Sequence, residues 1–140
     1  MKNNKIFTGV IEYNGREDFS INCNEIPHTI YLKEPSLKYF NNDYVEFFIN
    51  KRKRKGKYLA VVNKLIKREK THYVGVLQKN DNFSFAILDD KKIHVDIFIP
   101  RDNVNNANDG DKVIVEILTW KRNDVSPTGR IKEILGVPGE

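Results

Sequence analysis

The chain has 140 residues, of which 39% are hydrophobic and 31% charged, a composition typical of a globular protein with a charged surface. Its single cysteine, Cys23, excludes an intrachain disulfide framework. No apolar run approaches the roughly 20 residues of a membrane-spanning helix, and no signal-peptide pattern follows Met1. We therefore expect a cytoplasmic protein with no membrane partner.

The positive charge lies in the first half of the chain. Residues 1–70 carry 15 Lys+Arg against 8 Asp+Glu, whereas residues 71–140 carry 9 against 11, and the whole chain has a formal net charge of +5. A one-sided basic balance favours a polyanionic partner, of which nucleic acid is the commonest. The alternative is a solvated basic face without a partner, and charge alone does not decide between them.

The first half of the chain reads as five short β-strands. Alternating and β-branched residues predict them over 5–13, 19–22, 29–32, 43–49 and 58–66. Asn14-Gly15 is typical of the turn between the first two strands. The seven residues from Lys51 to Lys57 include six cations, and we predict that they form the hairpin loop between the last two strands, with Gly56 at the turn.

The second half repeats this plan. Strands are predicted over 73–79, 83–88, 96–99, 112–120 and 130–135. Gly9-Val10-Ile11 returns as Gly75-Val76-Leu77, and Ile30-Tyr31-Leu32 returns about 67 residues later as Ile97-Phe98-Ile99. A repeat of this length indicates one small domain copied in tandem. The sequence therefore predicts an all-β protein of two tandem five-stranded barrels of the OB-fold type, residues 1–69 and 70–140.

The residue pattern contains no catalytic or metal site. His28, His72 and His94 are far apart, and none pairs with Cys23 at the spacing of metal ligands. There is no Gly-rich phosphate loop and no nucleophile with an adjacent base. The Asp-Asp-Lys-Lys sequence at 89–92 could be imagined as a metal-binding pair, but we interpret it as a hairpin turn. We expect no catalytic residue and no cofactor in this chain.

Three phenylalanines form the best binding signal. Phe83 and Phe85 are two positions apart in one strand, so their rings leave the same sheet face, and Phe98 in the next strand can join them. Such a row suits stacking on unpaired bases. The alternative is that the rings face the core, because Phe is usually buried. Aliphatic residues at the intervening positions favour the first reading, because they already supply a core: Ala86, Ile97 and Ile99.

The basic run is the second binding signal. In OB-folds the loop between the fourth and fifth strands flanks the oligonucleotide groove, where cations can follow a phosphate backbone. A solvated loop is the alternative. The predicted RNA-contacting cations are Lys51, Arg52, Lys53, Arg54, Lys55 and Lys57.

Two segments resemble the RNA-binding motifs of cold-shock domains. Asn82-Phe83-Ser84-Phe85-Ala86-Ile87 is similar to the first motif, Lys-Gly-Phe-Gly-Phe-Ile, although Ser84 replaces a glycine. Ile97-Phe98-Ile99 is similar to the second, Val-Phe-Val-His-Phe, although Pro100 replaces its histidine. The stretches 96–100, 107–113 and 136–140 resemble the second cold-shock domain of the bacterial ribonuclease R family, and the first half resembles the first such domain more weakly.

This resemblance implies a role in a 3′–5′ exoribonuclease of the ribonuclease II/R family. The two domains would bind single-stranded RNA and guide it to a magnesium-dependent catalytic domain outside these 140 residues, with no cofactor here. By their positions in the motifs it adds four RNA-binding candidates: Lys79, Tyr13, Phe19 and Tyr31. We expect a monomer. Two alternatives stay open, a stand-alone cold-shock-type nucleic-acid chaperone and an OB module that docks on a protein.

Overall fold

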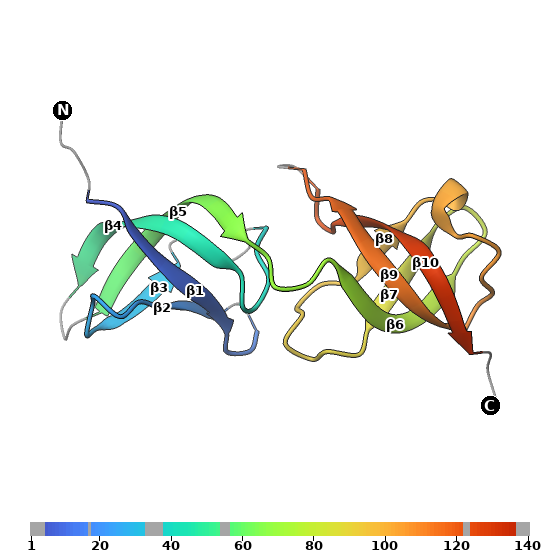
Figure 1. The fold of residues 1–140 in the computed structure, drawn as a ribbon, viewed down its shortest axis with the longest axis horizontal. Helices are drawn as coiled ribbons and strands as arrows, with labels where there is room; N and C mark the ends of the chain where they lie inside the picture. Colours follow the sequence, from blue (N-terminus) through green and yellow to red (C-terminus); the bar gives the residue numbers. More distant parts are fainter. Residues whose placement is uncertain (1–4, 17, 33–37, 54–56, 122–123, 137–140) are drawn as a thin grey trace. The chain divides into compact units, whose positions relative to one another are not determined.

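A computed structural model of the chain describes residues 5–16, 18–32, 38–53, 57–121 and 124–136. Its internal contacts divide the chain into two compact units, Met1–Glu69 and Lys70–Glu140, called unit 1 and unit 2 below. Apart from one short 3-10 helix, the regular structure of the described residues consists of β-strands (Figure 1). No helix in this part of the chain is long and apolar enough to cross a bilayer.

Unit 1 is a closed barrel of five strands. These are β1 (Phe7–Tyr13), β2 (Phe19–Asn22), β3 (Thr29–Leu32), β4 (Tyr44–Lys53) and β5 (Lys57–Lys67). They follow the order β1-β2-β3-β5-β4, and the pairing of β4 with β1 closes the barrel. All pairings are antiparallel except that of β3 with β5.

Unit 2 repeats this barrel. Its strands are β6 (His72–Lys79), β7 (Ser84–Leu88), β8 (Ile97–Ile99), β9 (Lys112–Thr119) and β10 (Thr128–Gly136), with the 3-10 helix η2 (Arg101–Asn103) after β8. The order β10-β8-β7-β6-β9 is again closed, and β8 and β10 form the parallel pair. The prediction of an all-β chain with two five-stranded barrels of the OB-fold type is confirmed.

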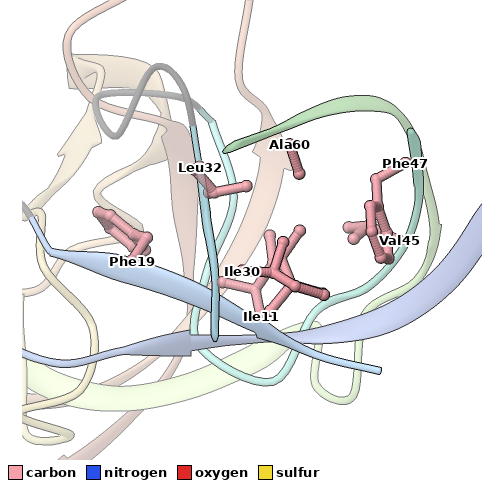
Figure 2. Close-up of a cluster of buried hydrophobic side chains, with 8 residues drawn as sticks. Ile11, Phe19, Ile30, Leu32, Val45, Phe47 and Ala60 are labelled. Carbon is pink, nitrogen blue, oxygen red and sulfur yellow. The ribbon is translucent and has the colours of Figure 1, made fainter. Parts of the chain in front are cut away.

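Each barrel is filled by every second residue of its strands, because successive side chains point to opposite faces of a sheet. Figure 2 shows this core in unit 1, where apolar side chains from all five strands meet. Its members are Ile11, Phe19, Ile21, Ile30, Leu32, Val45, Phe47 and Ala60. The buried apolar side chains on the strands of unit 2 are Tyr73, Leu77, Ala86, Ile97, Ile99, Val113, Val115 and Ile131.

The repeated glycines of the first strands allow a close approach of two backbones. A Cβ on Gly9 would lie 2.6 Å from the backbone oxygen of Asn22, and a Cβ on Gly75 would lie 2.6 Å from that of Ile87. No side chain fits these gaps, since a neighbouring strand crosses directly over the glycine. The sequence repeat around Gly9 and Gly75 therefore marks the same close approach of a neighbouring strand in both barrels.

A buried aspartate holds the turn before the fourth strand of each barrel. Asp43 and Asp111 are each 1% exposed, and their Oδ2 atoms accept hydrogen bonds of 2.7 Å from the backbone N–H of Phe40 and Asn108, respectively. In unit 1 the carboxylate also accepts two bonds from Arg68, Nε to Oδ1 at 3.0 Å and Nη2 to Oδ2 at 2.8 Å. In unit 2 no described residue pairs with Oδ1 of Asp111.

Candidate nucleic-acid interface

The three predicted phenylalanines of unit 2 form a continuous row on the outside of the barrel. Phe83 is 46% exposed, and Phe85 and Phe98 are half-buried. Ring centroids lie 5.7 Å apart between Phe83 and Phe85, and 5.7 Å apart between Phe85 and Phe98. The row arises because Phe85 and Phe98 are direct partners across β7 and β8. The aliphatic neighbours Ala86, Ile97 and Ile99 are fully buried, as the alternation predicts.

A shallow hollow continues the row on one side. The rings of Phe85 and Phe98 line it together with Asp124, with Val125, which is 88% exposed, and with Ser126 and Thr128. Thr128 begins β10 and pairs with Phe98 through the parallel ladder. Unpaired bases stacked on the rings would therefore have beside them one apolar side chain, two hydroxyl groups and one carboxylate.

The cations of unit 2 differ in how far they are already paired. Arg130 forms an ion pair with Glu116, and its hydrogen bond is the main reason why the pKa of that carboxyl lies below its usual range. Lys112 pairs with Asp89. Lys79 and Arg101 form no ion pair with another described residue, and both line one depression with Phe83. These two cations are therefore placed to meet phosphate groups beside the aromatic row.

Unit 1 presents a different surface at the equivalent positions. Strand pairing aligns Ser20 with Tyr31 in unit 1 as it aligns Phe85 with Phe98 in unit 2. Tyr31 is half-buried and points outward between two buried neighbours, so it remains a stacking candidate. Of the unit 2 row, only Phe98 has an aromatic counterpart in unit 1.

The assignment of Phe19 to the RNA-binding face is wrong. Phe19 is 3% exposed and lies in the core of unit 1 (Figure 2). Its ring centroid is 5.0 Å from that of Tyr13. Its counterpart in the ladder is the buried Ser84 and not Phe85, because Phe19 pairs with Tyr13 as Ser84 pairs with Lys79. Tyr13 is half-buried against the same core, whereas Lys79 is exposed.

The basic run is not the simple hairpin loop that the sequence predicts. Its first three residues continue β4 and pair with β5, Lys51 with Leu59, Arg52 with Tyr58 and Lys53 with Lys57. Only 54–56 separate the strands, so Arg54 and Lys55 lie outside the described residues. Leu59 also pairs with Tyr31, which brings the basic strand end into register with the outward tyrosine.

Several residues of this surface have no signal in the sequence pattern. They lie in loops, in η2 or at the start of β10, which the barrel topology brings to the aromatic row: Asn80, Arg101, Asn106, Val125 and Thr128. The described residues contain no group of three His, Cys, Asp or Glu side chains suited to a metal ion.

Comparison with known proteins agrees with this architecture. Residues 85–140 match the cold shock domain family. Over 82 residues, 59% of the chain, the sequence is 30% identical to ribonuclease R of Thermotoga maritima, of which the match covers 11%.

Two solved structures share the fold. Mycoplasma genitalium RNase R, in complex with ribose methylated single-stranded RNA, matches 93% of this chain with a TM-score of 0.79 and 17% identity. Yeast Ssd1, a pseudonuclease, matches 96% with a TM-score of 0.76 and 17% identity. The matches cover 21% and 23% of those chains, so this chain spans only a small part of the relatives it resembles. The chain is thus a pair of OB barrels whose second barrel matches the cold shock domain family and whose sequence is similar to a small part of ribonuclease R.

Proposed function

We propose that the two barrels bind single-stranded RNA with little sequence preference and guide it to the catalytic part of a ribonuclease R-like 3′–5′ exoribonuclease. The observation that carries this proposal is the row of Phe83, Phe85 and Phe98 on an outer sheet face, above a core that is already filled. Aromatic rings in such a row stack on unpaired bases of any sequence. The solved Mycoplasma relative, which holds single-stranded RNA, supports the choice of ligand.

The two units would contribute in different ways. Unit 2 supplies stacking surface, whereas unit 1 supplies most of the positive charge and one outward tyrosine, Tyr31. A strand that contacted both units would be held by its bases on one and by its phosphates on the other. On this proposal the protein acts as a monomer in the cytoplasm, and magnesium-dependent cleavage belongs to residues outside this chain.

The proposal is tested by fluorescence anisotropy with a labelled oligouridine of about 14 nucleotides, long enough for two OB-fold sites. We expect saturable binding whose affinity falls between 50 and 200 mM salt. An RNA duplex of equal length should compete at least about tenfold less well than the single strand does. Equal competition by the duplex would contradict base stacking. No binding at either salt concentration would favour a module that docks on a protein.

Neutralising the basic run should flatten the salt dependence of binding. Each phosphate contact to a single strand contributes about 0.7 to the slope of log affinity against log salt, so losing two or three contacts should lower the slope by about 1.5–2. The test variant replaces three lysines at the joined ends of β4 and β5 by Gln: Lys51, Lys53 and Lys57. The control replaces three exposed lysines elsewhere: Lys64, Lys67 and Lys70. Equal slopes in the two triple variants would show that the run contributes only general charge.

A further inference from the structure

A polar pocket lies at the Phe83 end of the aromatic row, and it has features that non-specific stacking does not need. Its volume is about 350 Å³, within the usual range of small-ligand pockets. One wall is the loop between β6 and β7, and the other is the segment from η2 to Asn106. Phe83 belongs both to this pocket and to the row, so a strand stacked on the row leads to the pocket.

The two walls are held in place by hydrogen bonds. Arg101 Nη2 donates to the backbone oxygen of Asp81 at 3.2 Å and joins one wall to the other. Asn103 Nδ2 donates to the backbone oxygen of Gly129 at 3.1 Å, which ties the second wall to β10. Asn106 has a φ of 65°, a left-handed conformation that asparagine tolerates better than most residues. These bonds fix the two walls of the pocket relative to each other and to β10.

The side chains that line the pocket are suited to the edge of a nucleobase. Four asparagines line it. The amide of Asn105 donates to the backbone oxygen of Ile131 at 3.4 Å, whereas the amides of the other three, Asn80, Asn82 and Asn106, form no hydrogen bond with another described residue. An amide offers both a donor and an acceptor, as the Watson–Crick edge of an unpaired base requires. The ring of Phe83 can stack on the face of that base.

The charges of the pocket restrict the base further. Asp81 and Asp102 bring carboxylates, which only accept hydrogen bonds, while Lys79 and Arg101 can meet the phosphate. A carboxylate accepts well from an exocyclic amino group, such as N4 of cytosine, and repels the carbonyl oxygen that uracil has in its place. We propose that this pocket binds one unpaired nucleotide of the RNA and prefers a base with an exocyclic amino group over uracil.

This inference rests on the proposed RNA binding and is tested with a matched pair of bases. Cytosine replaces one uracil at each position in turn along the 14-nucleotide oligouridine, and affinities are measured by competition anisotropy. We expect cytosine at one or two positions to raise affinity about fivefold or more. If oligouridine binds but cytosine is neutral at every position, the pocket is overturned and the proposed function stands. If no RNA binds, the proposed function fails.

Substitutions in the pocket test whether its side chains cause the preference for cytosine over uracil. Asn80→Ala combined with Asn106→Gly should abolish it, measured as the ratio of two quantities, the affinity for the cytosine-substituted strand and the affinity for oligouridine. Asp81→Asn combined with Asp102→Asn should reduce it by removing the repulsion of uracil. Asn63→Ala, an exposed asparagine of unit 1, is the control and should change neither quantity. An unchanged preference in both double variants would place base selection elsewhere.

A second measurement does not depend on strand binding. Cytidine and uridine monophosphate are titrated into the protein, and the side-chain amide signals of Asn80, Asn82 and Asn106 are followed by NMR. We expect cytidine monophosphate to shift these signals at lower concentration than uridine monophosphate. Equal or absent shifts would overturn the pocket whatever the result with longer RNA.

Discussion

Replacement of Arg68 by Ala should lower the unfolding free energy of unit 1 by about 3 kcal/mol, because it leaves a buried carboxylate without its partner. Asp43 is 1% exposed, and the Arg68 guanidinium binds both of its oxygens. The same guanidinium lies 4.5 Å from the ring centre of Phe40, so the substitution also removes a cation–π contact. This loss of about 3 kcal/mol is at the low end of the range for buried ion pairs. The Arg68 side chain is 16% exposed, so in the variant water can take over part of its interaction with the carboxylate.

Hydrogen exchange measures this effect separately in each unit. The slowest amides of β1 to β5 should lose about 3 kcal/mol of protection, while those of β6 to β10 should keep theirs. Lys67→Ala, the exposed neighbour in β5, is the control and should change protection by less than about 0.5 kcal/mol. Asp43→Asn combined with Arg68→Ala should recover part of the loss, because no unpaired charge then remains buried. Equal effects of Arg68→Ala and Lys67→Ala would refute the role of the pair.

The outward row of unit 2 could be predicted from the sequence because two independent patterns agree there. Phe83, just before β7, and Phe85, within it, are two positions apart and face outward, whereas the small or aliphatic residues Ala86, Ile97 and Ile99 face inward. Only one face of each strand points into the core. The aliphatic residues occupy that face, so the phenylalanine rings lie on the outer one.

The same reasoning gives the wrong face in unit 1, because there an aromatic residue occupies a position that points into the core. Phe19 aligns with an aromatic position of the cold-shock motif only when the alignment is shifted by one residue. Such a shift moves every side chain to the opposite face of the strand. The correct register was present in the sequence, because Phe19 and Ile21 alternate with the polar Ser20 and Asn22. The similarity to the cold-shock motif outweighed that alternation in the prediction.

The pocket and the Arg68 pair could not be predicted from spacing in the sequence. Arg101 contacts the loop at Asp81, and Arg68 contacts Asp43 across 25 positions. Both contacts follow from closure of the barrel, which brings strand ends and loops together that local patterns treat separately. Strand alternation reports which face a residue occupies and gives no information about which loops meet.

Replacement of Phe85 or Phe98 by Ala should weaken binding of single-stranded RNA by about 1–3 kcal/mol each, the usual contribution of a base stacked on an aromatic ring. Phe83→Ala should have a similar effect. The fold should persist, because these rings lie outside the core formed by Leu77, Ala86 and Ile97. Trp120 is the only tryptophan and lies in unit 2, so its fluorescence during thermal unfolding checks that each variant is folded. Leu118→Ala, an exposed apolar residue of β9, is the control and should not change affinity.

Variants that keep apolar area without a ring separate stacking from simple burial. Phe98→Leu preserves most of the apolar surface but cannot stack, so we expect it to lose nearly as much affinity as Phe98→Ala. Phe98→Trp keeps a flat ring and should retain the affinity. If the Phe98→Leu variant binds RNA with the same affinity as the unchanged protein, the row acts as a general apolar surface and the stacking argument fails. If Leu binds weakly and Trp binds well, the ring face itself holds the base, and binding should then show little dependence on base identity away from the pocket beside Phe83.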